Sequence, residues 1–237
     1  MTYDATEKVL FSADAFGKFG ALDEENEWIN EARRYYFGIV GKFGVQVRNL
    51  LKKVEKLEVR KICPLHGPVL SEKIEYYLNA YNVWSSYEPE EEGILIAYTS
   101  VYGNTKKAVT LLKEKLKEKG KLKVRVIDLT RGDRSEAVAE AFRYNTLILA
   151  TTTYNGDVFP AMREFINCLI ERNFCKRRVA FIENGSWATA ATKVMREKLE
   201  KCKGLEFVDT SVKITSVLSE ESISQLEIMV NELCKNE

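Results

Sequence analysis

Histidine is the scarcest functional residue in this sequence, and its scarcity limits the chemistry that the chain can perform. The chain of 237 residues contains one histidine, His66. Imidazole is the usual nitrogen ligand of transition metals, so a chain with one histidine has few ways to complete such a centre by itself. The five cysteines are odd in number, widely spaced and without a Cys-x-x-Cys pair. This pattern favours reduced thiols in a cytoplasmic protein over disulfides or a zinc site.

Other absences exclude whole classes of protein. No apolar run approaches the length of a membrane span, and the first residues, MTYDATEK, lack the pattern of a signal peptide. We therefore expect no membrane and a cytoplasmic location. The formal net charge is +1, and no basic stripe interleaved with aromatic residues occurs, which argues against nucleic acid as a partner. Apolar residues make up 45% of the chain, which is enough for the core of a globular protein.

One break in composition divides the chain into a short part and a long part. Residues 85–93 (SSYEPEEEG) are polar and acidic and contain proline and glycine, which is typical of a linker. We place the linker at residues 88–93. It separates an N-terminal segment, residues 1–87, from a domain at residues 94–237.

The long part alternates apolar strands with amphipathic helices. Nearly continuous apolar runs predict strands covered on both faces, and one alternating run predicts an edge strand. This order predicts an α/β fold with right-handed crossovers and a doubly wound parallel sheet, whose ligands bind beyond the carboxyl ends of the strands. The predicted strands are Ile94–Thr99, Thr146–Thr151, Val179–Ile182 and the edge strand Leu122–Asp128, and the predicted helices are Asn104–Lys119, Pro160–Arg172, Thr189–Lys201 and Glu220–Lys235.

The N-terminal segment has too few elements for a domain of its own. Val9–Ser12 and Val59–Cys63 have the pattern of strands, Glu24–Lys56 is mostly helical in pattern, and Ile74–Trp84 predicts another helix. Two short strands and a few helices cannot close a sandwich or a sheet. The segment therefore has the composition of the end of a larger domain.

A loop of hydroxyl and amide residues leads from the first strand directly into a helix. A phosphate at this position meets unpaired backbone N–H groups, the positive end of the helix dipole and side-chain donors. The spacings of a Walker A loop and of G-x-G-x-x-G are both absent. The pattern predicts a phosphate monoester held by neutral donors, and the alternative is a hydroxyl-rich helix cap. The loop residues are Ser100, Val101, Tyr102, Gly103, Asn104 and Thr105.

This loop, S-V-Y-G-N-T, resembles the flavodoxin phosphate loop [ST]-x-[ST]-G-N-T, with Tyr102 where a hydroxyl residue is usual. The variant of this loop with an aromatic residue at that position is similar to the loop in the flavodoxin domains of flavodiiron proteins (A-type flavoproteins). T-T-T-Y-N resembles that family's S-P-T-Y-N loop, with Thr152 in place of proline, and E-N-G-S-W-A-T resembles its G-S-y-G-W-s-G loop with rearranged glycines. The resemblance implies bound FMN, with aromatic faces for its ring. The implied binding residues of these two loops are Thr153, Tyr154, Asn155, Gly156, Asn184, Gly185, Ser186 and Trp187.

Two motifs in the N-terminal segment extend the resemblance over the whole chain. L-F-S-A-D-A-F-G, with Asp14, and I-C-P-L-H-G-P-V, with His66, resemble segments near the end of the metallo-β-lactamase-like domain of flavodiiron proteins. The resemblance implies an aspartate that bridges two irons and a histidine that is a terminal ligand. The family's H-x-E-x-D-H cluster is absent, and two ligands cannot complete a diiron site. The alternative is that both residues belong to ordinary turns.

These features predict an FMN-binding electron-transfer flavoprotein of the flavodiiron type, with the strand order 2-1-3-4-5 that the resemblance implies. Members of that family are oxidoreductases that reduce dioxygen or nitric oxide and receive electrons from rubredoxin or a similar donor. This chain would supply the flavin half, as a fragment, a truncated product or one of two chains. We assign no catalytic residue, and expect a diiron site only if a missing N-terminal part is supplied. The expected assembly is a homodimer or a complex with an N-terminal partner chain.

Three other functions stay open. The first is a stand-alone flavodoxin-like electron carrier, although such carriers usually have strongly acidic surfaces, and residues 91–237 contain 24 basic and 21 acidic residues. The second is a flavin-dependent quinone or nitro reductase, for which the sequence offers no dinucleotide fingerprint. The third is a flavin-free interaction module.

Overall fold

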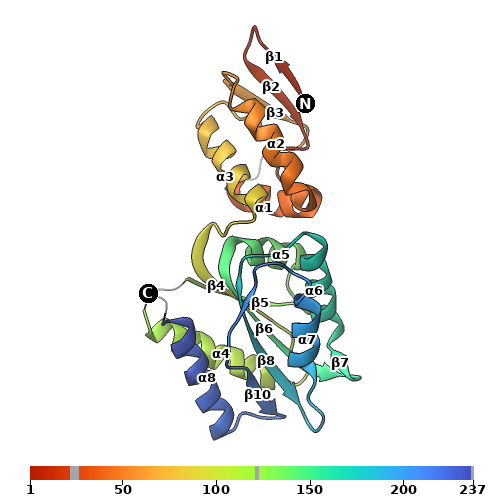
Figure 1. Ribbon diagram of the computed structural model, residues 1–237, viewed down its shortest axis with the longest axis vertical. Coiled ribbons are helices and arrows are strands. Elements are labelled where there is room, and N and C mark those ends of the chain that lie inside the picture. The colour runs from red at the N-terminus through yellow and green to blue at the C-terminus, as the bar shows by residue number, and fades with distance from the viewer. Residues whose placement is uncertain (22–26, 121–122, 236–237) are drawn as a thin grey trace. The chain divides into compact units, whose positions relative to one another are not determined.

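The computed structural model describes residues 1–21, 27–120 and 123–235, and the chain divides into two compact units, Met1–Glu88 and Pro89–Glu237 (Figure 1). The predicted start of the first helix at Glu24 and of the edge strand at Leu122 lie outside the described residues. No described helix has both the length and the apolar character needed to cross a membrane.

The second unit is built on a parallel sheet of five main strands. They lie side by side in the order β10-β8-β6-β4-β5, and every neighbouring pair is parallel. Counted along the chain, this is the order 2-1-3-4-5, so the predicted doubly wound flavodoxin-like fold is confirmed. The strand predicted at the edge, β5, pairs only with β4. The five strands are β4 (Glu91–Tyr98), β5 (Lys123–Asp128), β6 (Tyr144–Tyr154), β8 (Arg178–Gly185) and β10 (Val212–Thr215).

Helices cover both faces of this sheet (Figure 1). On one face, α4 and α8 pack their apolar residues against a buried row that includes Ile96, Ile148 and Ile182. The other three helices cover the opposite face. Burial on both faces explains why the central strands are nearly continuous apolar runs. The helices are α4 (Asn104–Glu118), α5 (Arg134–Arg143), α6 (Pro160–Glu171), α7 (Ala191–Leu199) and α8 (Glu220–Leu233).

The observed strands are longer than the predicted ones. β4 begins at Glu91, inside the predicted linker, where the Glu91 carboxylate forms ion pairs with Lys123 and Arg143. β6 and β8 continue to Tyr154 and Gly185, into segments predicted as loops. These polar strand ends lack the apolar pattern that marks the buried parts of the strands, so hydrophobicity placed the start of β4 too late and the ends of β6 and β8 too early.

Four described elements of the second unit were missing from the sequence prediction: α5, β10 and the two-residue strands β7 (Asp157–Val158) and β9 (Glu206–Phe207). The helix α5 is rich in alanine, and its N-cap is Asp133, whose carboxylate accepts hydrogen bonds from the backbone N–H groups of Ser135 and Glu136. The strand β10 is four residues long. An alanine-rich helix and a four-residue strand both give weak periodic signals, because few large apolar residues mark the buried face.

The first unit is a small sheet covered by helices. β1 (Thr2–Asp4), β2 (Val9–Ala13) and β3 (Lys61–Pro64) lie in that order, with β2 in the centre. The segment predicted as mostly helical, residues 24–56, contains two helices in its described part, which a π-helical segment and a 3₁₀ turn at residues 36–43 separate. Glycines at positions 38, 41 and 44 weaken helix propensity at this break. The helices are α1 (Trp28–Tyr35), α2 (Gly44–Val54) and α3 (Ile74–Ser86).

Candidate functional site

The three predicted loops meet at one cavity beyond the carboxyl ends of β4, β6 and β8. Its volume is about 470 Å³, and of the predicted cofactor-binding residues only Gly103 is absent from its lining. The prediction omitted three residues that also line it, Thr152, Ala188 and Ser216. Ser216 had no sequence signal, because the strand before it, β10, was not predicted.

The first loop presents the N-terminus of α4 to this cavity. Gly103 is the N-cap of the helix and has a φ of 86°, a left-handed conformation that favours glycine. The Ser100 hydroxyl accepts a hydrogen bond from the N–H of Lys106 at 3.2 Å. The N–H groups of Asn104 and Thr105 lie in the first turn, where no intrahelical acceptor exists, and are available to an anion.

The second loop is a hairpin that holds an aromatic ring at the cavity. β6 turns back into β7 (Asp157–Val158) through Asn155 and Gly156, whose φ values of 51° and 72° are both positive, as in a type I′ turn. The ring of Tyr154 packs edge-on against Phe159, with 5.6 Å between ring centroids, and Tyr154 remains 45% exposed. The hairpin therefore fixes an aromatic face that is still accessible.

The hydroxyl of Thr153 holds the start of α7 in place. Its oxygen accepts hydrogen bonds from the N–H groups of Ala190 and Ala191 at 3.0 and 3.2 Å. The buried carboxylate of Glu183 accepts a further bond from the N–H of Thr192 at 2.9 Å. Thr153 therefore positions the third loop, whether or not it also contacts a ligand.

Asn184 connects three of the segments around the cavity. Its side-chain amide donates to the Thr105 hydroxyl in α4 and to the carbonyl of Ser216, both at 3.4 Å. Beside it, a Cβ on Gly185 would lie 2.8 Å from the Thr189 side chain, so the close approach of the loop requires glycine. These contacts fix the third loop against the helix N-terminus.

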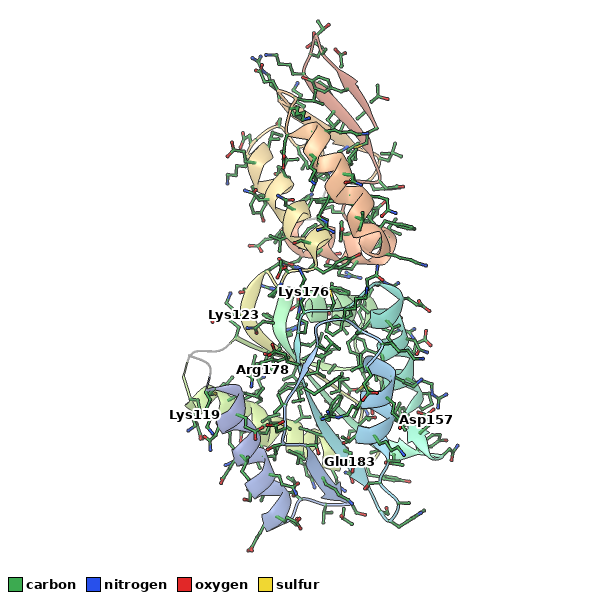
Figure 2. All side chains as sticks on the ribbon, viewed as in Figure 1. Lys119, Lys123, Asp157, Lys176, Arg178 and Glu183 are labelled. Atoms are coloured by element: carbon green, nitrogen blue, oxygen red, sulfur yellow. The ribbon has the colours of Figure 1, made fainter. Side chains whose placement is uncertain are left out.

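Two aromatic side chains at this site are almost completely exposed. Tyr102 is 91% exposed and Trp187 is 89% exposed, and both line the cavity. Aromatic rings stabilise a protein by burial, so rings left in water at a cavity mark a surface that covers a ligand. No charged side chain lines the described part of this cavity. The labelled basic residues Lys123 and Arg178 lie at the opposite end of the sheet from Glu183 (Figure 2).

In the first unit, the structure brings Asp14 and His66 together. The His66 Nε2 atom lies 3.7 Å from an Asp14 carboxylate oxygen, and both side chains are more than half exposed. The Tyr35 hydroxyl donates to the same carboxylate at 3.0 Å. Burial, together with this hydrogen bond, raises the pKa of Tyr35 to about 12. Among the described residues, no group of three or more His, Cys, Asp and Glu is placed to hold a metal ion, so the described residues do not fit a diiron centre.

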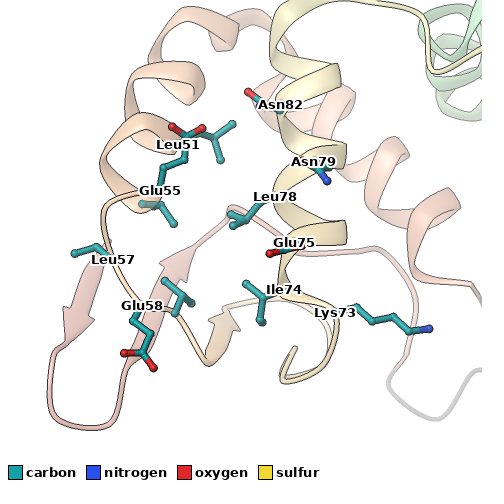
Figure 3. Close-up of a pocket in the computed structure, with 12 residues that line it drawn as sticks. Leu51, Glu55, Leu57, Glu58, Lys73, Ile74, Glu75, Leu78, Asn79 and Asn82 are labelled. Carbon is teal, nitrogen blue, oxygen red and sulfur yellow. The ribbon is translucent and has the colours of Figure 1, made fainter.

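A larger cavity of about 700 Å³ lies between α2 and α3 in the first unit. Its floor is apolar, with Leu51, Ile74 and Leu78, and its rim carries Glu55 and Glu75 (Figure 3). None of the predicted site residues lines it, and it presents no helix N-terminus with a glycine turn. Size alone therefore does not identify the functional cavity.

Comparisons with known proteins agree with this geometry. A flavodoxin domain family model matches residues 95–213. A protein of Methanocaldococcus jannaschii is 28% identical over 218 residues, which are 88% of this chain and 54% of that protein. The chain spans about half the length of the curated relatives it matches.

Solved structures extend the likeness to both units. Rubredoxin:oxygen oxidoreductase from Desulfovibrio gigas has a TM-score of 0.89 at 22% identity, over 98% of this chain and 60% of that one. The flavodiiron protein from Giardia intestinalis has a TM-score of 0.89 at 20% identity, over 98% of this chain and 59% of that one. The chain therefore belongs to the flavodoxin domain family, and its two units have the fold of the corresponding parts of flavodiiron proteins.

Proposed function

We propose that this chain binds FMN noncovalently in the cavity of the second unit and transfers electrons as the flavin half of a flavodiiron-type protein. The observation that carries the proposal is the pair of exposed rings, Tyr102 and Trp187, on two loops that border one cavity beside a helix N-terminus. A bound FMN would supply the redox chemistry, because its ring accepts and releases electrons.

The N-terminus of α4 suits the phosphate of such a ligand. The N–H groups of Asn104 and Thr105, with the Ser100 and Thr105 hydroxyls nearby, are neutral donors at the positive end of the helix dipole. A terminal phosphate can bind there without a lysine or arginine. The aromatic residues at the loop tips, Tyr102, Tyr154 and Trp187, would bind the ring and exclude water from its faces.

We expect the purified protein to carry FMN rather than FAD. The first loop suits one terminal phosphate, and the described residues of the second unit form no further βαβ pair, outside the one parallel sheet, that could hold an adenylate. The cofactor released by denaturation should migrate with FMN on reversed-phase chromatography. FAD in its place would contradict the assignment. A colourless chain that fails to bind added FMN would favour the flavin-free interaction module.

The names of the relatives support a proposal for the electron donor. One structural neighbour is named as an oxidoreductase of rubredoxin and oxygen, and we propose a rubredoxin-like or similar donor for this chain. A metal centre as acceptor would need ligands beyond Asp14 and His66. We propose that such ligands, if this chain uses them, come from an additional N-terminal part, either in the same chain or in a partner.

We therefore predict that this chain of 237 residues by itself binds no stoichiometric iron. A stable diiron site needs several carboxylate and imidazole ligands held by surrounding hydrogen bonds, and the pair of Asp14 and His66 is open to solvent. Elemental analysis after purification without chelators should give far fewer than two irons per chain. About two irons per chain would contradict the prediction and would mean that other ligands complete the site.

A further inference from the structure

Thr152 lines the flavin cavity, but its hydroxyl has no hydrogen-bond partner. The Oγ1 atom is buried and forms no hydrogen bond in the described part of the chain. An unpaired buried hydroxyl costs about 1–3 kcal/mol, so such a group indicates a partner that binds there. The Thr192 hydroxyl is also buried and unpaired, but Thr192 does not line the cavity.

The register of the sheet places Thr152 at the phosphate end of the cavity. Strand alternation puts it on the same face as Ile148 and Ala150, the face that α4 and α8 cover. On the neighbouring strand its partner in register is Asn184, whose amide donates to Thr105 in the first turn of α4. Thr152 therefore lies beside the side chain that reaches the helix N-terminus, whereas Trp187 lies in the loop beyond β8.

We propose that the Thr152 hydroxyl donates a hydrogen bond to the ribityl-phosphate chain of the bound flavin. This inference rests on the proposed FMN site. Because Thr152 lines the cavity and its buried hydroxyl has no partner among the described residues, a ligand in the cavity can supply the missing acceptor. The proline that stands here in the loop it resembles could not form this bond, because it has no hydroxyl.

The absence of charge in the described cavity lining increases the importance of each neutral donor. A phosphate here meets no lysine or arginine side chain among the described lining residues. Hydrogen bonds to an ionised group are about twice as strong as those between neutral groups. A single added hydroxyl at this end can therefore change flavin affinity measurably.

The test compares variants of the full chain, stripped of flavin and titrated with FMN and with riboflavin by flavin fluorescence. Thr152→Val keeps the size and branching of the side chain and removes the hydroxyl, and should raise the Kd for FMN about tenfold or more. Thr152→Ser restores the hydroxyl and should bind within about threefold of the wild type. Thr192→Val, the matched control, removes an unpaired buried hydroxyl outside the cavity and should leave the Kd unchanged.

Riboflavin, which lacks the phosphate, shows whether the Thr152 hydroxyl binds the phosphate or the ribityl part of the flavin. A loss confined to FMN assigns the bond to the phosphate, and an equal loss for riboflavin assigns it to the ribityl hydroxyls. Wild-type FMN affinity in Thr152→Val overturns the inference. So does equal weakness of Thr152→Val and Thr152→Ser, since packing of the methyl group would then be the cause. A wild-type chain that binds neither flavin overturns the proposed function as well.

Discussion

Replacing both Tyr102 and Trp187 by alanine should abolish tight FMN binding while leaving the protein as stable as the wild type. The two rings are 91% and 89% exposed, so neither contributes much to folding, and their loss should change the free energy of unfolding by no more than about 0.5 kcal/mol. Stacking on an aromatic side chain stabilises a bound ring by about 1–3 kcal/mol. Removing two such contacts should weaken FMN by roughly 100-fold or more.

Two measurements test this expectation. Fluorescence titration of the apoprotein gives the Kd, and urea denaturation gives the free energy of unfolding. Phe11→Ala is the matched control, because Phe11 is a half-exposed aromatic residue of the first unit, away from the cavity lining. It should not change FMN affinity. If the double variant binds FMN as the wild type does, the two rings do not cover the flavin and the ligand site must be sought elsewhere.

Trp187 also gives a spectroscopic signal of its own. The other two tryptophans, Trp28 and Trp84, belong to the first unit. Tryptophan fluorescence of the wild type should be quenched in the holoprotein and should recover when FMN is removed. This FMN-dependent change should be lost in Trp187→Ala. A quenching difference that persists in this variant would assign the effect to another tryptophan.

The sequence predicts the fold of the second unit well because burial on both faces leaves a strong pattern. β4, β6 and β8 each contain a continuous apolar run, and strand–helix alternation then restricts the topology to parallel crossovers. The same reasoning misses β10 and α5, whose residues give weaker patterns. The 3₁₀ and π segments at residues 36–43 were also missed, since helical periodicity continues through them.

Sequence reasoning identified the cavity residues but not their individual roles. Loop motifs placed Thr153 among the expected flavin contacts, and only the three-dimensional structure shows that its hydroxyl accepts two hydrogen bonds from the start of α7. Thr152 was noticed only as a departure from the resembled motif, because an unpaired hydroxyl is a property of three-dimensional packing. The proximity of Asp14 and His66 likewise depends on long-range packing, which only the resemblance to a known family could indicate beforehand.

Trp84→Ala should strongly destabilise the first unit and leave FMN binding intact. Trp84 is 1% exposed, and its ring lies among other aromatic rings of the first unit. The centroid distances are 6.0 Å to Trp28 in α1, 5.3 Å to Tyr36 in the segment between α1 and α2, and 5.3 Å to Tyr81 in α3. Replacing a buried tryptophan by alanine costs about 3–5 kcal/mol. That loss is a large share of the total stability of a small unit, commonly about 5–15 kcal/mol.

The same change tests whether the second unit is autonomous. The second unit has its own core and contains every described residue that lines the proposed FMN cavity, so its affinity for FMN should stay within about twofold of the wild type. The matched control is Phe165→Ala, which removes a fully buried ring from the core of the second unit and should weaken flavin binding together with stability.

Far-ultraviolet circular dichroism during urea denaturation should give an earlier first transition for Trp84→Ala, with the flavin released only at the later transition. Loss of FMN in the first transition would mean that the flavin site depends on the first unit, and that the two units act as one cooperative fold.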